Sequence, residues 1–124
     1  MTEIVAILPV PPSANGLFRN LPRGGRAKTR AYETWLSEAG PIIFSAWHDA
    51  GRPTMAPPLR FVLETSAGRQ RDVSNMIKPV EDAFVASIPA LPDDRWNDEV
   101  IAVRRDRGDE RIIIATLSSM GPPG

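Results

Sequence analysis

Two long stripes of apolar residues, each with the spacing of a buried helix face, constrain the fold of this chain most strongly. They cover residues 30–50 and 74–88, where apolar side chains recur at intervals of three and four. Gly40-Pro41 predicts a kink or a division in the first helix, and Pro79 must lie in an early turn of the second. The residues predicted to face the core are Tyr32, Trp35, Leu36, Ala39, Ile42, Ile43, Ala46 and Trp47 on the first helix, and Met76, Ile77, Val80, Ala83, Phe84 and Ile88 on the second.

Short apolar runs of the kind that form strands lie before, between and after these helices. Residues 13–29 are predicted to be a loop, and residues 104–111 a polar hairpin region between the last two strands. The order β-α-β-α-β-β predicts an α+β fold, in which a small mixed sheet of about four strands packs with two helices. The predicted strands are residues 3–8, 59–65, 100–103 and 112–117.

The length of 124 residues suits one domain, which we assign to residues 1–120, followed by a disordered tail at 121–124. The chain has no cysteine and a single histidine, His48, which excludes thiol chemistry and histidine-rich metal sites. Catalysis would have to use carboxylates, lysine or hydroxyls, and the natural metals are hard, oxygen-ligated cations. Without a leader-like or membrane-spanning apolar segment, we expect a cytoplasmic protein that does not associate with membranes.

The net charge of zero conceals an uneven distribution. Residues 1–71 hold nine basic and five acidic side chains, whereas residues 72–110 hold five basic and ten acidic ones. A basic region that leads to an acidic pocket is what a metal-dependent nuclease requires, because the substrate is a polyanion and the metal needs carboxylate ligands. The alternative is ordinary solvated charge on the surface of an average domain.

The clearest basic segment, residues 19–30, contains no acidic residue. Gly24-Gly25 would let its backbone adapt to a ligand, and its cations could bind phosphates without reading sequence. A flexible exposed loop is the alternative explanation. The cations of this segment are Arg19, Arg23, Arg26, Lys28 and Arg30.

The acidic half begins with Arg71-Asp72-Val73-Ser74-Asn75-Met76-Ile77-Lys78 and reaches Asp93-Asp94 one helix later. On the helix, Ser74, Lys78 and Glu81 share a face, and Asp82 lies beside it. Taken singly, these residues are explained as helix caps, turn formers or solvated charges. Together, carboxylates that converge with a lysine predict a Mg²⁺ site that acts on phosphate.

These motifs resemble those of the RusA-type Holliday junction resolvases over nearly the whole chain. The matching elements, in order, are Leu8-Pro9-Val10-Pro11-Pro12-Ser13-Ala14-Asn15 with Arg19, the Arg71 to Lys78 motif, and Asp93-Asp94. The resemblance implies a homodimeric, Mg²⁺-dependent endonuclease of phage or prophage origin. Such an enzyme cuts four-way DNA junctions symmetrically in DNA recombination and repair.

Carried over by position, the resemblance makes Asp72 the first catalytic carboxylate, Lys78 the essential lysine and Asp94 the acid after the helix. It implies metal ligands among Asp72, Asp93, Asp94 and Glu81. The DNA-binding set comprises Asn15, Arg19, Arg23, Arg26, Lys28, Arg30, Arg69, Arg71 and Asn75.

The departure from the family pattern is Ser74, where the family has a second aspartate. Either activity is weakened, or another acid compensates. Our hypothesis is that Glu81, two helical turns away on the same face, compensates, with Asp82 as the second choice. In the turn, Asp98 could replace Asp94. The competing functions are a junction-binding protein that has lost cleavage and a small interaction module without enzymatic activity.

Overall fold

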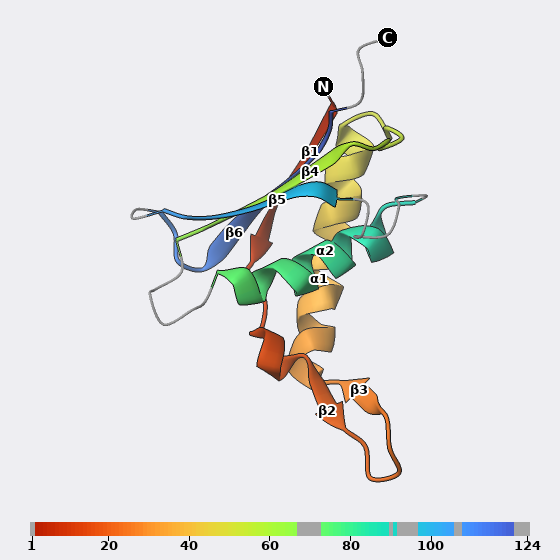
Figure 1. Ribbon diagram of the computed structural model, residues 1–124, viewed down its shortest axis with the longest axis vertical. Coiled ribbons are helices and arrows are strands. Elements are labelled where there is room, and N and C mark those ends of the chain that lie inside the picture. Colours follow the sequence, from red (N-terminus) through yellow and green to blue (C-terminus); the bar gives the residue numbers. More distant parts are fainter. Residues whose placement is uncertain (1, 67–72, 90, 92–96, 106–107, 121–124) are drawn as a thin grey trace.

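The computed structural model describes residues 2–66, 73–89, 91, 97–105 and 108–120. Its two long helices and four-stranded mixed sheet confirm the predicted α+β class (Figure 1). No helix in this described part of the chain combines the length and apolar character needed to cross a membrane. The elements are β1 (Thr2–Pro9), the 3₁₀ turn η1 (Ala14–Gly16), β2 (Phe18–Asn20), β3 (Arg26–Lys28), α1 (Arg30–Asp49), β4 (Leu59–Thr65), α2 (Ser74–Ser87), β5 (Asn97–Arg104) and β6 (Ile112–Ser119).

The main sheet has the strand order β1-β6-β4-β5. The central strand β6 runs antiparallel to both β1 and β4, while β5 pairs in parallel with β4. The predicted hairpin over residues 104–111 is therefore wrong, because β5 and β6 are not neighbours. The reason lies in burial: every second side chain of β6 is enclosed in the core, whereas most of β5 is exposed. The more apolar strand takes the centre, where both of its edges are paired.

Both helices cover the same face of this sheet. Phe61 of β4 meets Phe84 of α2 edge to face, with ring centroids 5.5 Å apart. On α1, the indole Nε1 of Trp35 donates a hydrogen bond to the carbonyl oxygen of Pro9 at the end of β1, at 2.8 Å. Residues from both helices and the inward face of the strands form a single core cluster. One face of the sheet is thus buried beneath the helices.

The helix predictions hold closely, with two differences: α1 is not divided, and Ile42, which was predicted to face the core, is 38% exposed. The helix α2 begins at Ser74 and contains Pro79 in its second turn, as predicted. The helix α1 is not divided, since it runs unbroken through Pro41. Ala39 and Ile43 are fully buried on either side of this exposed proline, and their packing keeps the two halves of the helix in line.

The predicted loop over residues 13–29 is instead ordered into η1 and the two-stranded sheet β2-β3. This hairpin projects from the rest of the molecule (Figure 1). Thr29 ties its base to α1, because the Thr29 hydroxyl donates to the Gly16 carbonyl at 2.6 Å and accepts from the backbone N–H of Tyr32 at 3.2 Å. The hairpin is therefore anchored at the N-terminus of α1.

Candidate functional site

Five of the predicted site residues lie outside the described part of the chain. They are Arg69, Arg71, Asp72, Asp93 and Asp94. The structure therefore says nothing of two of the three predicted catalytic residues. It does place the third, Lys78, on α2. The other described parts that bear predicted site residues or their neighbours are the rest of α2, the start of β5 and the whole basic segment.

On α2, Lys78 is paired with Asp82. The Lys78 Nζ lies 3.1 Å from Asp82 Oδ1, one helical turn further on, and the two side chains are 61% and 40% exposed. An ion pair this exposed contributes little to stability, because water screens both charges. The pair is therefore available for a role at the surface, and it presents a cation and a carboxylate side by side.

Glu81 lies in a different environment from Lys78, although only three residues separate them. It is buried, with 8% of its surface exposed, and its Oε2 accepts a hydrogen bond from the side-chain amide of Asn97 at the start of β5. A carboxylate this enclosed needs such a partner, because burial removes its water. The spacing of apolar residues along α2 did not predict that Glu81 is buried. The contact joins the middle of α2 to the beginning of β5.

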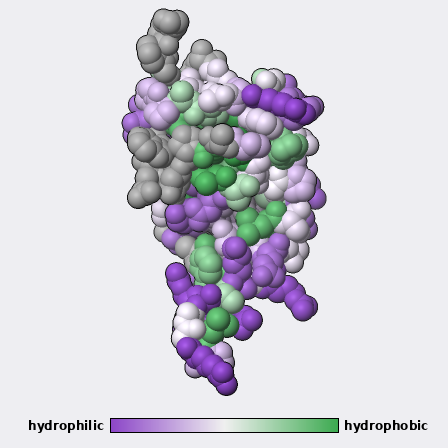
Figure 2. Space-filling view, turned by 90° about the vertical axis from the view of Figure 1, so that its right-hand side faces the viewer, coloured by the Kyte–Doolittle hydropathy of each residue, from purple (hydrophilic) through white to green (hydrophobic). Residues whose placement is uncertain are grey.

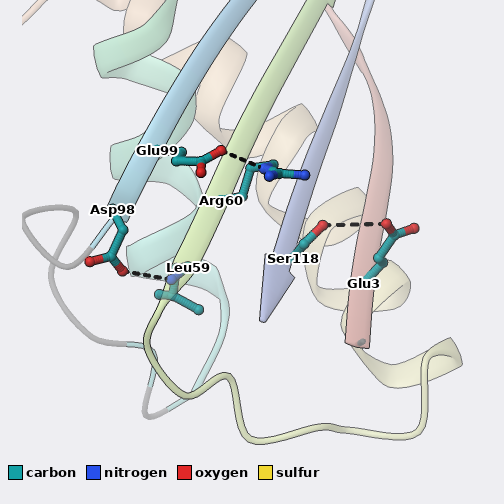
Figure 3. Close-up of polar contacts among 6 residues, drawn as sticks. All are labelled: Glu3, Leu59, Arg60, Asp98, Glu99 and Ser118. Carbon is teal, nitrogen blue, oxygen red and sulfur yellow. Dashed lines mark hydrogen bonds and ion pairs between the residues drawn. The ribbon is translucent and has the colours of Figure 1, made fainter. Parts of the chain in front are cut away.

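Asp98 has a structural role that the sequence did not reveal. Its Oδ2 accepts the backbone N–H of Leu59 at 2.8 Å (Figure 3). The register between β4 and β5 shifts at this point, because Leu59 pairs with Asn97 and the next residue, Arg60, pairs with Glu99. Asp98 is thus the extra residue of a bulge, and its carboxylate satisfies the donor that the bulge leaves unpaired. This contact accounts for Asp98 without a catalytic role.

No group of three potential metal ligands occurs among the residues that the structure describes. Glu81 is the one predicted ligand that it does place, and Glu81 is engaged by Asn97. The described carboxylates alone therefore do not make a metal site. The compensation of Ser74 by Glu81 stays a prediction, and Ser74 itself is exposed at the first position of α2.

The basic segment forms what we call the basic hairpin, residues 18–28. Gly24 and Gly25 adopt left-handed φ values of 92° and 80° at its turn, a conformation that glycine takes without strain. Hydrophilic side chains gather on this projection (Figure 2). Of the five cations in the predicted basic segment, four lie on the hairpin and are exposed, and the fifth, Arg30, is exposed at the first position of α1; the four are Arg19, Arg23, Arg26 and Lys28.

A chain of aromatic contacts runs from the basic hairpin toward α2. The Arg26 guanidinium carbon lies 4.8 Å from the ring centroid of Phe18, and the Phe18 ring meets Tyr32 of α1 edge to face at 5.8 Å. Burial raises the pKa of the Tyr32 hydroxyl, the charge of Asp82 raises it further, and Lys78 lowers it. Tyr32 is thus within electrostatic reach of the exposed ion pair on α2.

Phe18 and Tyr32 were not among the predicted site residues. Tyr32 was assigned to the core stripe of its helix, which is correct, since 2% of its surface is exposed. The available signal for Phe18 was a large aromatic side chain directly before Arg19 in a segment otherwise rich in cations and glycine. An aromatic residue in such a place supports cation–π contacts and base stacking.

No protein-family model matches this sequence, and no curated protein matches it. The resemblance to the RusA-type resolvases therefore rests on the motifs quoted above. The geometry around α2 and the basic hairpin is independent of that resemblance.

Proposed function

We propose that this protein is a Mg²⁺-dependent, structure-specific endonuclease that cuts four-way DNA junctions. The observation that carries the proposal is the chain of contacts from the basic hairpin through Phe18 to Tyr32 on α1, the helix that packs against α2 with its Lys78–Asp82 pair. A phosphate backbone held by the cations of the hairpin would pass next to the helix that bears the predicted catalytic lysine. Binding and chemistry would then share one surface.

The carboxylates expected to hold Mg²⁺ lie close in sequence to two described elements, the start of α2 and the start of β5. Asp72 precedes Ser74, the first residue of α2, by two positions, and Asp94 precedes Asn97 by three. Asn97 is in turn bonded to Glu81, which lies seven residues after Ser74, about 10 Å along the helix axis. This arrangement supports a site at one side of α2, where Asp72, Asp93, Asp94 and Glu81 would supply the oxygen ligands that Mg²⁺ prefers.

The carboxylate oxygens of these residues suit a hard cation, provided that Asp72 and Asp94 complete the set of ligands. Bound Mg²⁺ would lower the pKa of a coordinated water and neutralise charge on the scissile phosphate. Lys78 would place a compact positive charge near the phosphate oxygens, where negative charge accumulates during hydrolysis. Asp82 would hold the ammonium group of Lys78 in position, and Asn97 would orient the Glu81 carboxylate.

The test uses a labelled four-way junction and a linear duplex of the same composition, each incubated with the protein in Mg²⁺ or in EDTA. We expect the junction to be cut in Mg²⁺ alone. We expect Lys78→Met to lower the cutting rate by about a hundredfold or more, because it removes charge stabilisation that acts in the transition state. Arg52→Ala is the matched control, since Arg52 is an exposed cation after the far end of α1, bonded to His48.

The alternatives give different results in the same assay. Junction binding without cutting in either condition would identify a junction-binding protein whose cleavage was lost with the aspartate that Ser74 replaces. Neither binding nor cutting would identify an interaction module and would contradict the nuclease proposal.

A further inference from the structure

One face of the basic hairpin carries an aromatic ring among cations. In the register of the hairpin, Phe18 pairs with Lys28, and Asn20 pairs with Arg26. Cross-strand partners point to the same face of a two-stranded sheet, and so do alternate residues of one strand. These four side chains therefore share one face, which we call the aromatic face of the hairpin. The residues between them point to the opposite face.

Phe18 and Arg26 form a layered pair on the aromatic face. The Arg26 guanidinium carbon lies over the Phe18 ring, 4.8 Å from its centroid, where the negative face of the ring attracts a cation. Within the part of the chain that the structure describes, Arg26 forms no ion pair with an acid. Phe18 remains 37% exposed. The pair thus presents planar, positively charged surface to solvent.

Contacts with the core hold the Phe18 ring in position. The ring meets Tyr32 edge to face, and Tyr32 stacks on Trp35 with ring centroids 6.4 Å apart. Tyr32 and Trp35 are both buried. The base of the hairpin is closed by the backbone N–H of Thr29, which donates to the carbonyl oxygen of Leu17 at 2.9 Å. A planar surface that is already fixed loses little conformational freedom when a ligand stacks on it.

We propose that the aromatic face of the hairpin binds an unpaired DNA base, which stacks on the Phe18–Arg26 pair while Lys28 contacts a neighbouring phosphate. Nucleic-acid bases stack on aromatic rings and on guanidinium planes, without a requirement for a particular sequence. A base within a duplex is covered on both sides by its neighbours, so only an unpaired base offers a free face. This inference rests on the proposed function for the choice of DNA as the ligand, and it does not depend on cleavage.

Two substitutions remove stacking surface and keep the charge of the hairpin. Phe18→Leu keeps an apolar side chain against Tyr32 but has no aromatic face. Arg26→Lys keeps the positive charge but lacks the planar guanidinium. Phe44→Leu is the matched control, because Phe44 is 44% exposed and contacts a second aromatic ring, Trp47, near the other end of α1. If Phe18 only closes the hairpin against α1, none of these substitutions changes the contribution of bases to binding.

The experiment is a fluorescence anisotropy titration in EDTA with two labelled probes, an oligothymidylate and an abasic oligomer of the same length. Both probes carry the same phosphate charge and only the first carries bases, so the ratio of their dissociation constants measures base contacts. We expect the wild type to bind the oligothymidylate at least about fivefold more tightly than the abasic oligomer. Phe18→Leu should reduce this preference to less than about twofold, and Arg26→Lys should reduce it as well. Binding of the abasic oligomer should be unchanged in both variants.

Phe18→Trp and Phe44→Leu should keep the preference for bases, the first because indole also offers an aromatic face. Equal affinity of the wild type for the two probes, or no binding to either, would overturn the proposal. So would a full preference in a Phe18→Leu protein that circular dichroism shows to be folded. If Phe18→Leu does not fold, an unchanged preference in Arg26→Lys would overturn it instead.

The junction-cutting assay separates this inference from the proposed nuclease function. A protein that prefers the oligothymidylate but cuts no junction in Mg²⁺ would support the stacking site and contradict the nuclease. A protein that cuts junctions but binds both probes equally would do the reverse.

Discussion

Replacing the cations of the basic hairpin by alanine should weaken DNA binding in a way that depends on salt. The four side chains, Arg19, Arg23, Arg26 and Lys28, are exposed, and none forms an ion pair with an acid of the described chain. Their charge is therefore available to phosphates. Each cation that neutralises a phosphate of B-form DNA adds about 0.9 to the slope of log affinity against log salt concentration.

The variant lacking all four cations should thus lower the magnitude of this slope by about 3.6 when all four contact phosphates. For each phosphate-binding cation that the variant lacks, a fourfold rise in salt concentration should lower the affinity of the wild type about 3.5-fold more than that of the variant. The assay is a fluorescence anisotropy titration of a labelled junction at four salt concentrations, in EDTA to prevent cutting.

Arg52→Ala is the control for general loss of positive charge, because Arg52 is distant from the hairpin along α1. Its slope should equal that of the wild type. A change of slope below about one for the four-cation variant, or an equal change for Arg52→Ala, would refute the assignment of the hairpin as the phosphate-binding element.

Three further predictions concern the surroundings of α2 and the core. Burial raises the pKa of Tyr32 above its ordinary 10.0 and the negative charge of Asp82 raises it further, so Asp82→Asn should lower that pKa, which tyrosinate absorbance reports directly from the single tyrosine of the chain. In the wild type, the raised pKa stabilises the fold fully below pH 10, and this stabilisation is lost as pH rises through the raised pKa. Glu81→Gln keeps an acceptor for Asn97 but removes a negative charge, so Mg²⁺-dependent cutting should fall about tenfold or more. Intact cutting would disprove the hypothesis that Glu81 compensates for the aspartate that Ser74 replaces. Phe61→Ala removes a fully buried ring and should lower the free energy of unfolding by about 3–5 kcal/mol in urea denaturation, whereas a loss below about 1 kcal/mol would contradict its place in the core.

The helices of this protein could be predicted closely because their apolar spacing is a local signal. The second helix begins at the predicted Ser74, and five of the residues predicted to be buried there are buried, with Ile77 half-buried. Glu81 is also buried, although it was not predicted to be, and its carboxylate accepts a hydrogen bond from Asn97, sixteen residues further on. When a side chain pairs with a residue of another element, the apolar spacing of its own helix does not predict its burial.

For the candidate site, the sequence indicated the kinds of residue but not their arrangement. The exposure of the cations is expected from composition, since a segment with five cations and no acid is not buried, but the hairpin that positions them was predicted as a loop. The contact of Phe18 with Tyr32, and the electrostatic reach of Tyr32 to the Lys78–Asp82 pair, required the packing of the hairpin against α1 and of α1 against α2. Only that packing brings the basic half of the chain next to the acidic half.

Local patterns in the amino-acid sequence determined the class of fold, the extent of both helices and the absence of thiol and histidine-cluster chemistry, because each depends on residues close together or on composition alone. The tertiary structure decided the strand order, the bulge at Asp98 and the exposure of Val5, Ile7 and Ile101 on the sheet. These features depend on which strand lies beside which. That choice is made by competition among all the strands for the buried centre of the sheet, where both hydrogen-bonding edges and the inward side chains are removed from water.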